Sequence, residues 1–161
     1  MEPRDLRTSL RQKFPALEEF PCLMPHPSFY VPAAQLVEVA THLKTELGFR
    51  LLADLAGLDC QELGRSPRFE VIYNFYSVTY HDRLFLKVRV EEDEKLCRVP
   101  SLCGVYATAN WYEREVWDMY GIRFDGHPHL KRILMYEGFV GHPLRKDYDI
   151  RHRQPLIPGS D

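Results

Sequence analysis

Two neighbouring runs of apolar and aromatic residues constrain the fold of this chain more than any other feature of its sequence. Residues 69–80 are dense in β-branched and aromatic side chains. In residues 84–91 every second position is aliphatic, namely Leu84, Leu86, Val88 and Val90. Alternation of this kind is typical of strands, and two such runs in succession predict an antiparallel hairpin.

Helices are predicted on the N-terminal side of the hairpin. Residues 32–47 carry apolar side chains at a helical spacing, namely Leu36, Ala40, Leu43 and Leu47. Pro32 suits the first turn of that helix, and Gly48 fits a left-handed cap at its end. Residues 4–13 predict a shorter amphipathic helix that ends before Pro15.

The segments around these elements complete the predicted fold. Residues 49–58 are mostly apolar and predict a central strand, whereas the proline-rich residues 19–30 predict a loop or an edge strand. Residues 61–67 predict a polar loop, and the acidic run 91–94 predicts a solvated turn. This order of elements predicts a two-layer α+β fold, in which helices pack on a mixed, largely antiparallel sheet.

A third helix is predicted to begin at Asn110, which is a good N-terminal cap. Glu113 follows three residues later, as in a capping box, and Gly121 provides the stop. One face of this helix is apolar: Tyr112, Val116, Met119 and Tyr120. Arg114 and Asp118 lie four residues apart, so their side chains can pair, as can Arg114 with a carboxylate of a partner.

Composition and charge disfavour several classes of function. No apolar run approaches the roughly 18 residues that cross a bilayer, and the first residues lack the apolar core of a signal peptide. Residues 121–153 hold seven Lys or Arg against four Asp or Glu, which indicates an acidic protein surface as partner more than nucleic acid. We therefore expect a protein of the cytosol or matrix that meets a membrane only through other subunits.

Cofactor motifs are lacking in the sequence. It contains no Gly-x-Gly-x-x-Gly and no P-loop. The cysteines form no Cys-x-x-Cys pair, so neither an iron–sulfur cluster nor a zinc ribbon is expected in this chain alone. Disulfides are not expected either, and buried or unreactive thiols are predicted for Cys22, Cys60, Cys97 and Cys103.

The most specific signal is an ordered series of motifs in the second half of the chain. The series comprises Glu113-Arg114-Glu115, Trp117-Asp118-Met119-Tyr120-Gly121, Gly126-His127-Pro128, Leu130-Lys131-Arg132-Ile133-Leu134 and Gly141-His142-Pro143-Leu144-Arg145-Lys146-Asp147-Tyr148. It resembles the signature of the 30 kDa subunit of respiratory complex I, the NADH-quinone oxidoreductase. One position departs from that pattern, because Asp149 stands where the family has proline.

The resemblance implies a non-catalytic structural subunit in the peripheral arm of a proton-pumping NADH:quinone oxidoreductase. Such a subunit lies on the cytoplasmic side of the inner (plasma) membrane and packs against the 49 kDa-type hydrogenase-like subunit, with the iron–sulfur subunits close by. FMN, iron–sulfur clusters and quinone belong to those partners, so no cofactor is expected here. The resemblance favours a compact domain over residues 1–140 and an extended segment over residues 141–161 that wraps a partner, with a frayed terminus as the alternative.

The residues of the signature are accordingly expected to serve structure and interfaces, with none in catalysis, cofactor binding or metal binding. They are Trp111, Glu113, Arg114, Glu115, Asp118, Gly121, His127, Pro128, Arg132, His142, Pro143, Arg145, Lys146 and Asp147. Paired carboxylates beside an arginine could form an acid–base centre. Here, however, Arg114 would keep Glu113 and Glu115 ionised, which disfavours a general acid.

Three other interpretations stay open at this point. The chain could be the equivalent subunit of a membrane-bound hydrogenase, or of a complex I relative that another donor feeds. It could be a stand-alone metal-dependent hydrolase built on His127, His129 and His142 with Asp or Glu partners, although the histidines lack a helical His-x-x-x-His spacing. It could also be a binding module outside any electron-transfer complex.

Overall fold

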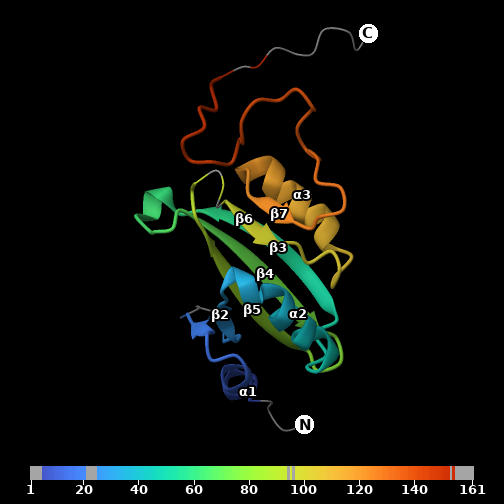
Figure 1. Ribbon diagram of the computed structural model, residues 1–161. Coiled ribbons are helices and arrows are strands. Elements are labelled where there is room, and N and C mark those ends of the chain that lie inside the picture. The colour runs from blue at the N-terminus through green and yellow to red at the C-terminus, as the bar shows by residue number, and fades with distance from the viewer. Residues whose placement is uncertain (1–4, 21–24, 94, 96, 153, 155–161) are drawn as a thin grey trace.

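The computed structural model describes residues 5–20, 25–93, 95, 97–152 and 154 (Figure 1). Its elements are α1 Leu6–Lys13, β1 Glu18–Glu19, β2 Ser28–Tyr30, η1 Ala33–Gln35, α2 Leu36–Thr45, β3 Leu51–Asp59, η2 Gln61–Leu63, β4 Phe69–Ser77, β5 Asp82–Val90, β6 Arg98–Pro100, α3 Ala109–Tyr120 and β7 Arg123–Asp125. One sheet has the strand order β1-β2-β5-β4-β3, and β6 and β7 form a separate parallel pair. Because β2 runs parallel to β5 and the other neighbours are antiparallel, the predicted mixed, largely antiparallel sheet is confirmed.

The predicted hairpin forms the middle of this sheet. Strands β4 and β5 pair in register from Phe69 opposite Val90 to Ser77 opposite Asp82. Alternate side chains of both strands are buried, namely Val71, Tyr73, Phe75, Leu84, Leu86 and Val88. They share one hydrophobic core with the apolar faces of α2 and α3, so the helices cover a single face of the sheet and the two-layer α+β fold is confirmed.

Strand β3 lies at the edge of the sheet, so the prediction of a central strand at residues 49–58 is wrong. Among the described strands, it pairs with β4 alone. Its apolar composition has another cause, because Leu52 and Leu55 are buried in the core and Gly57 lies against the ring of Tyr120 in α3. A Cβ atom at Gly57 would lie 2.6 Å from Cδ2 of that ring, so any other residue would force the ring to shift.

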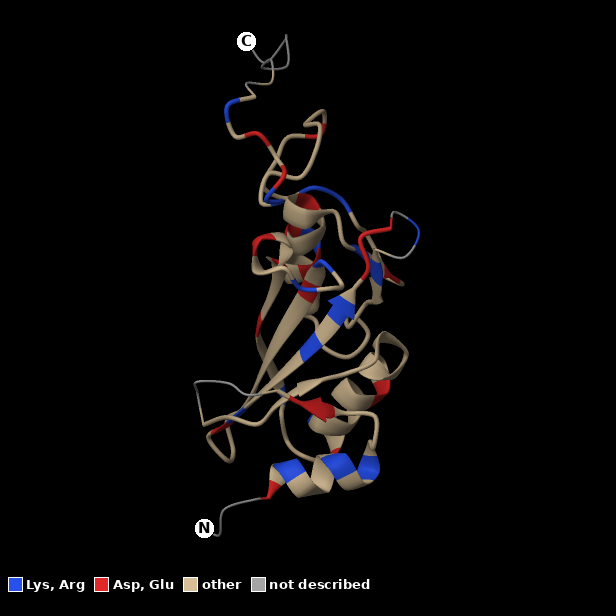
Figure 2. Ribbon diagram, turned by 90° about the vertical axis from the view of Figure 1, so that its left-hand side faces the viewer, with Lys and Arg blue, Asp and Glu red and all other residues tan. Residues whose placement is uncertain are grey.

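Helices α1 and α2 confirm the two N-terminal predictions. Helix α1 buries its leucines and is capped by the carboxylate of Asp5, which accepts a backbone N–H of the first turn. Its basic residues, whose positions along the helix are blue in Figure 2, are exposed, and Arg7 pairs with Glu19 of β1. The short 3₁₀ turn η1 leads into α2, and Gly48 follows that helix in the left-handed conformation with a φ of +73°.

Helix α3 confirms the predicted stop and corrects the predicted start. Gly121 ends the helix in the left-handed conformation, with a φ of +78°. Asn110 lies inside the first turn, because the helix begins at Ala109 and Thr108 occupies the capping position. The hydroxyl of Thr108 donates to the carbonyl of Leu52 in β3 at 3.2 Å, so tertiary contacts rather than a capping side chain fix this end of the helix.

After β7 the described chain forms no further helix or strand and passes over the outer side of α3 (Figure 1). Residues 126–152 are called the C-terminal segment below. Residues 153 and 155–161 of the predicted extended segment 141–161 lie outside the described residues, as does Cys22. No helix that the structure describes has the length and hydrophobicity that a bilayer crossing requires.

Candidate functional site

The carboxylate of Asp118 is the centre of the contact between α3 and the C-terminal segment. Its side chain is fully buried. One carboxylate oxygen accepts the backbone N–H groups of Ile133, Leu134 and Met135 at 3.0, 2.8 and 2.9 Å. The other oxygen accepts from Nη1 of Arg132 at 2.5 Å. Burial by itself raises the pKa of Asp118, but these donors outweigh it and hold the pKa below its ordinary value.

Arg114 binds the backbone of the same stretch of chain, and the pairing with Asp118 that the helical spacing allows does not form. Its Nε donates to the carbonyl of Lys131 at 3.1 Å, and its Nη2 donates to the carbonyl of Arg132 at 3.0 Å. The guanidinium also lies 5.4 Å from the centre of the Trp111 ring. Helical spacing brings Arg114 and Asp118 to one side of α3, but each of them binds the backbone of the C-terminal segment instead of the other.

The last carbonyl groups of α3 accept hydrogen bonds from the second half of the C-terminal segment. Nδ1 of His142 lies 3.0 Å from the carbonyl oxygen of Asp118, and the N–H of Leu144 donates to the carbonyl of Met119 at 3.1 Å. Nε of Arg145 donates to the carbonyl of Tyr120 at 2.6 Å. Because a helix leaves its last carbonyls without partners of its own, these residues act together as a C-terminal cap.

A buried arginine fastens the end of this segment to the sheet. Arg68, which precedes β4, donates to Asp59 at the end of β3 and to Asp147 at 2.8 Å. It also donates to Glu92 at 2.5 Å, and the N–H of Lys146 donates to Asp59 at 2.9 Å. Burial raises the pKa of Asp59, but its hydrogen bonds with Arg68 and the backbone lower that pKa to about 2. Of these residues, sequence reasoning singled out only Asp147 and Lys146, because no local pattern connects positions 59, 68, 92 and 147.

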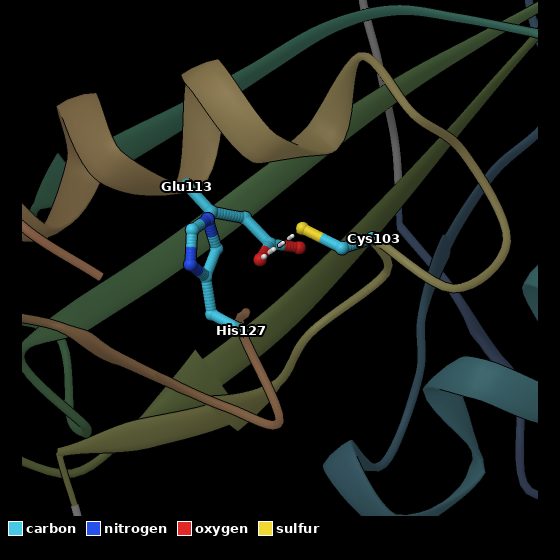
Figure 3. A group of neighbouring side chains, drawn as sticks. All are labelled: Cys103, Glu113 and His127. Atoms are coloured by element: carbon cyan, nitrogen blue, oxygen red, sulfur yellow. Dashed lines mark hydrogen bonds between the residues drawn. The ribbon is translucent and has the colours of Figure 1, made fainter. Parts of the chain in front are cut away.

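Glu113 is fully buried on the opposite side of α3 and holds the loop after β6 (Figure 3). Its carboxylate accepts from the N–H of Leu102 and from Oγ of Ser101, both at 2.6 Å, and from Sγ of Cys103 at 3.4 Å. Burial raises its pKa although these hydrogen bonds lower it. The predicted capping box and the predicted control of its charge by Arg114 are therefore wrong, since Arg114 contacts the C-terminal segment instead.

The side chains of Cys103, Glu113 and His127 are the one group of potential metal ligands found within the described residues (Figure 3). Their ligating atoms lie within 4.8 Å of one another. Nδ1 of His127 accepts the N–H of His129 at 3.0 Å, so the ring proton is on Nε2, which lies 3.0 Å from the carbonyl of Asn110. Both nitrogens are thus engaged, and the group fits a hydrogen-bonded cluster better than a metal site. Neither His129 nor His142 belongs to it, so the geometry does not support a three-histidine site.

The remaining residues of the predicted signature form the outer surface. Trp111 is 63% exposed, and Glu115 and Pro128 are exposed as well. Asp118 is not exposed with them, because the C-terminal segment covers it. That segment exposes apolar side chains of its own: Leu134, Val140, Leu144 and Ile150.

The cysteines of the described chain are unpaired, as predicted. Cys60 and Cys97 are buried, and Cys103 is half-buried. Burial raises the pKa of all three thiols, and that of Cys103 to about 11. They are therefore protonated and weakly nucleophilic at neutral pH.

Lower pH is expected to destabilise the chain through His142. Burial, and then the nearby Arg145 and Arg132, lower its pKa, although the carbonyl of Asp118 opposes this. The unfolded chain therefore binds more protons than the folded one just below pH 6.5, and the free energy of unfolding should fall as the pH falls through that value. Urea unfolding at pH 8, 6 and 5 measures it.

The matched variant for this prediction is His142→Asn, which keeps a donor near Asp118 but does not titrate. Its stability should depend less on pH between 7 and 5 than that of the unaltered chain. His42, whose pKa burial also lowers, titrates in the same direction, so part of the dependence will remain. Equal slopes for the two proteins would contradict the assignment.

Comparisons with known proteins agree on one family. The sequence profile described as "Respiratory-chain NADH dehydrogenase, 30 Kd subunit" matches residues 29–154. A C-type subunit of the NADH-quinone oxidoreductase of Rhizobium meliloti (strain 1021) is 48% identical over 134 residues, which are 81% of this chain and 71% of that protein. Its counterpart in the NADH-quinone oxidoreductase of Geotalea uraniireducens (strain Rf4) is 48% identical over 116 residues, 72% of this chain and 68% of that protein.

Two solved structures share the fold. The trypsin-resistant fragment (1-134) of Nqo5 superposes with a TM-score of 0.69 and 30% identity, over 77% of this chain and 97% of the fragment. A chain of the archaeal membrane-bound sulfane sulfur reductase superposes with a TM-score of 0.77 over 91% of this chain and 85% of that one. Its identity of 23% makes this second likeness one of fold alone.

Proposed function

This chain belongs to the family of the 30 kDa subunit of the respiratory-chain NADH dehydrogenase, and from that premise we propose that it positions its partner subunits without taking part in the chemistry. The assembly is a proton-pumping NADH:quinone oxidoreductase. The partners in this proposal are the 49 kDa-type hydrogenase-like subunit and the iron–sulfur subunits of the peripheral arm. The chain then lies on the cytoplasmic side of the membrane, and other subunits attach the arm to it.

The observation that carries this proposal is an irregular segment whose backbone is hydrogen-bonded to α3 and which still exposes apolar side chains. Arg114 and Asp118 bind the backbone of residues 131–135, and the end of α3 binds residues 142–145. All of these contacts fix the path of the chain. The backbone of the segment is bonded to α3, while Leu134 and Val140 are exposed to solvent. Such an arrangement suits a binding surface that must be presented in one conformation.

Rigid presentation matters for electron transfer even when the chain carries no redox group. Functional sites lose efficiency when the elements that support them shift by about 1 Å. A subunit that fixes the relative placement of cofactor-bearing partners would therefore affect the rate of quinone reduction. In this proposal the flavin, the clusters and the quinone are all bound by those partners.

Purification of the assembly tests this function. Membranes are solubilised gently, the tagged chain is recovered, and the co-purifying subunits and the NADH:quinone activity are recorded. A flavin- and cluster-containing assembly is expected, together with an isolated chain that contains no stoichiometric metal. Recovery of the chain alone, or of the isolated chain with a bound metal and hydrolytic activity, would refute the proposal. If the chain co-purifies with subunits that do not oxidise NADH, the assembly is a relative of complex I that takes its electrons from another donor.

Trp111→Ala is expected to weaken assembly without unfolding the chain. The indole is largely exposed, and large aromatic side chains dominate the binding energy of protein interfaces. Recovery of partner subunits should fall by about tenfold or more, while the midpoint of urea unfolding of the isolated chain should change little. Val78→Ala is the control, because Val78 is equally exposed but lies in the turn between β4 and β5 and not on α3. Equal recovery for the two variants would remove Trp111 from the interface.

A further inference from the structure

A basic cleft opens beside the C-terminal end of α3. Its volume is about 520 Å³, and its charged and aromatic lining comprises Glu92, Trp117, Arg123, Arg132, His142 and Arg145. The lining comes from four parts of the chain, since Glu92 follows β5, Trp117 belongs to α3, Arg123 begins β7 and the last three residues belong to the C-terminal segment. Three arginines therefore face one glutamate, and Lys and Arg gather around this end of α3 (Figure 2).

Two of these arginines are held in place mainly by backbone carbonyls. Nε of Arg145 donates to Tyr120, and Nη2 of Arg132 donates to Gly141 at 3.0 Å. The guanidinium of Arg132 also lies 5.8 Å from the centre of the Trp117 ring and 5.6 Å from that of Phe139. Carbonyl groups orient a guanidinium but carry no net charge, and Arg145 forms no ion pair with a carboxylate of the described residues. Only Arg132 has a carboxylate partner, which is Asp118.

The other charges of the cleft do not compensate for this excess. The side chain of Arg123 is exposed and has no hydrogen-bond or ion-pair partner among the described residues. The single acid of the lining, Glu92, is 2.5 Å from Nη1 of Arg68, which lies outside the lining. Burying an arginine-rich surface against a partner is costly unless each charge finds an acceptor.

Gly121 brings two nitrogen atoms together on one side of the cleft. A Cβ atom at that glycine would lie 2.6 Å from Nε2 of His142 and 2.7 Å from Nη2 of Arg145. Nδ1 of His142 faces the carbonyl of Asp118 and must carry the proton of the neutral ring. Nε2 is then bare, and it becomes a further donor when the ring is protonated. The absence of a side chain at Gly121 thus leaves room for both nitrogens at the same point.

We propose that this cleft receives the carboxylate of an aspartate or glutamate of a neighbouring subunit. The proposal rests on the proposed function, because it presumes that partners cover this end of α3. A carboxylate is the occupant that the lining favours, since the planar fork of arginine matches its two oxygens and the arginines are already oriented. Arg123, at the exposed rim, is the residue best placed to reach it.

Zero-length cross-linking tests the chemistry of the occupant. In the purified complex of the Arg123→Lys variant, a carbodiimide joins the new amine to a carboxylate only when the two are in contact. Mass spectrometry is expected to find position 123 linked to an aspartate or glutamate of another subunit. Arg50→Lys is the control, because Arg50 is exposed before β3, at the end of that strand away from Asp59, and should give no such link.

Charge reversal tests whether the contact matters. Arg123→Glu should reduce recovery of partner subunits about tenfold, whereas Arg50→Glu should leave it unchanged. Since the side chain of Arg123 has no partner in the described chain, urea unfolding of both isolated variants should match that of the unaltered protein. Absence of a cross-link at position 123 in an assembled complex overturns the proposal. A cleft that holds inorganic phosphate instead of a carboxylate would give this result. If the unaltered chain recovers no partner subunits, the proposed function itself has failed.

Discussion

Replacement of Asp118 by alanine is expected to lower the free energy of unfolding by about 3–5 kcal/mol, the cost of removing one partner of a buried ion pair. The variant leaves Arg132 without a carboxylate and the N–H groups of residues 133–135 without an acceptor. Each unsatisfied buried donor costs further free energy. Because small domains have only about 5–15 kcal/mol in total, most of the stability is at risk. Urea unfolding of the isolated chain measures the loss.

The matched control is Glu115→Ala, three residues earlier on the same helix. Glu115 is exposed, so its loss should change stability by no more than about 0.5 kcal/mol. Limited proteolysis gives a second readout, because the Asp118 variant should be cut within residues 131–145 much faster than the control. Similar unfolding curves for the two variants would show that the buried carboxylate does not hold the C-terminal segment.

Arg68→Ala is expected to have an effect of similar size, again about 3–5 kcal/mol. The buried carboxylate of Asp59 would keep its charge without its main partner, and Asp147 would lose its connection to the sheet. Arg65→Ala is the control. Arg65 is exposed, and its ion pair with Glu70 is long and therefore weak, with 3.8 Å between Nη1 and the carboxylate oxygen. Its loss should cost about 1 kcal/mol or less.

Acid unfolding distinguishes this ion cluster from simple packing. The pKa of Asp59 is lowered to about 2 and that of Asp147 is lowered as well, chiefly by Arg68. A lowered pKa contributes stability that is present above the ordinary value near pH 4 and is lost as the pH falls toward 2. The unaltered chain should therefore lose stability over that range, and Arg68→Ala should lose less. An identical pH dependence would assign the role of Arg68 to packing alone.

Periodicity predicted the helices and strands of this fold, because the pattern of polar and apolar residues within each segment determines which element it forms. Alternating leucines and valines identified the hairpin, and Gly121 identified the end of α3. The order of the strands in the sheet could not be predicted, because no local residue pattern encodes which strands pair. Residues 49–58 are apolar because α3 packs against this edge strand. Apolar composition alone is equally typical of a strand that lies between two others.

The candidate site shows the same limit in its side chains. Helical spacing placed Arg114 and Asp118 on one side of α3, and proximity then suggested a pair. Both residues instead bind a segment that lies 14 or more positions later in the chain, and spacing along a helix carries no information about such a distant segment. The Arg68 cluster was missed for the same reason, because Arg68 and Asp147 are 79 positions apart.

The long separation between Arg68 and Asp147 has a consequence for biosynthesis. At about 5–20 residues per second, a ribosome needs roughly 4–16 s to make the 79 residues between them. The hairpin has ample time to form during this interval, whereas the last carbonyls of α3 still face water. The outer surface with Leu134 and Val140 comes into existence only when the chain has closed over α3. A partner that recognises this surface therefore selects molecules whose folding is finished.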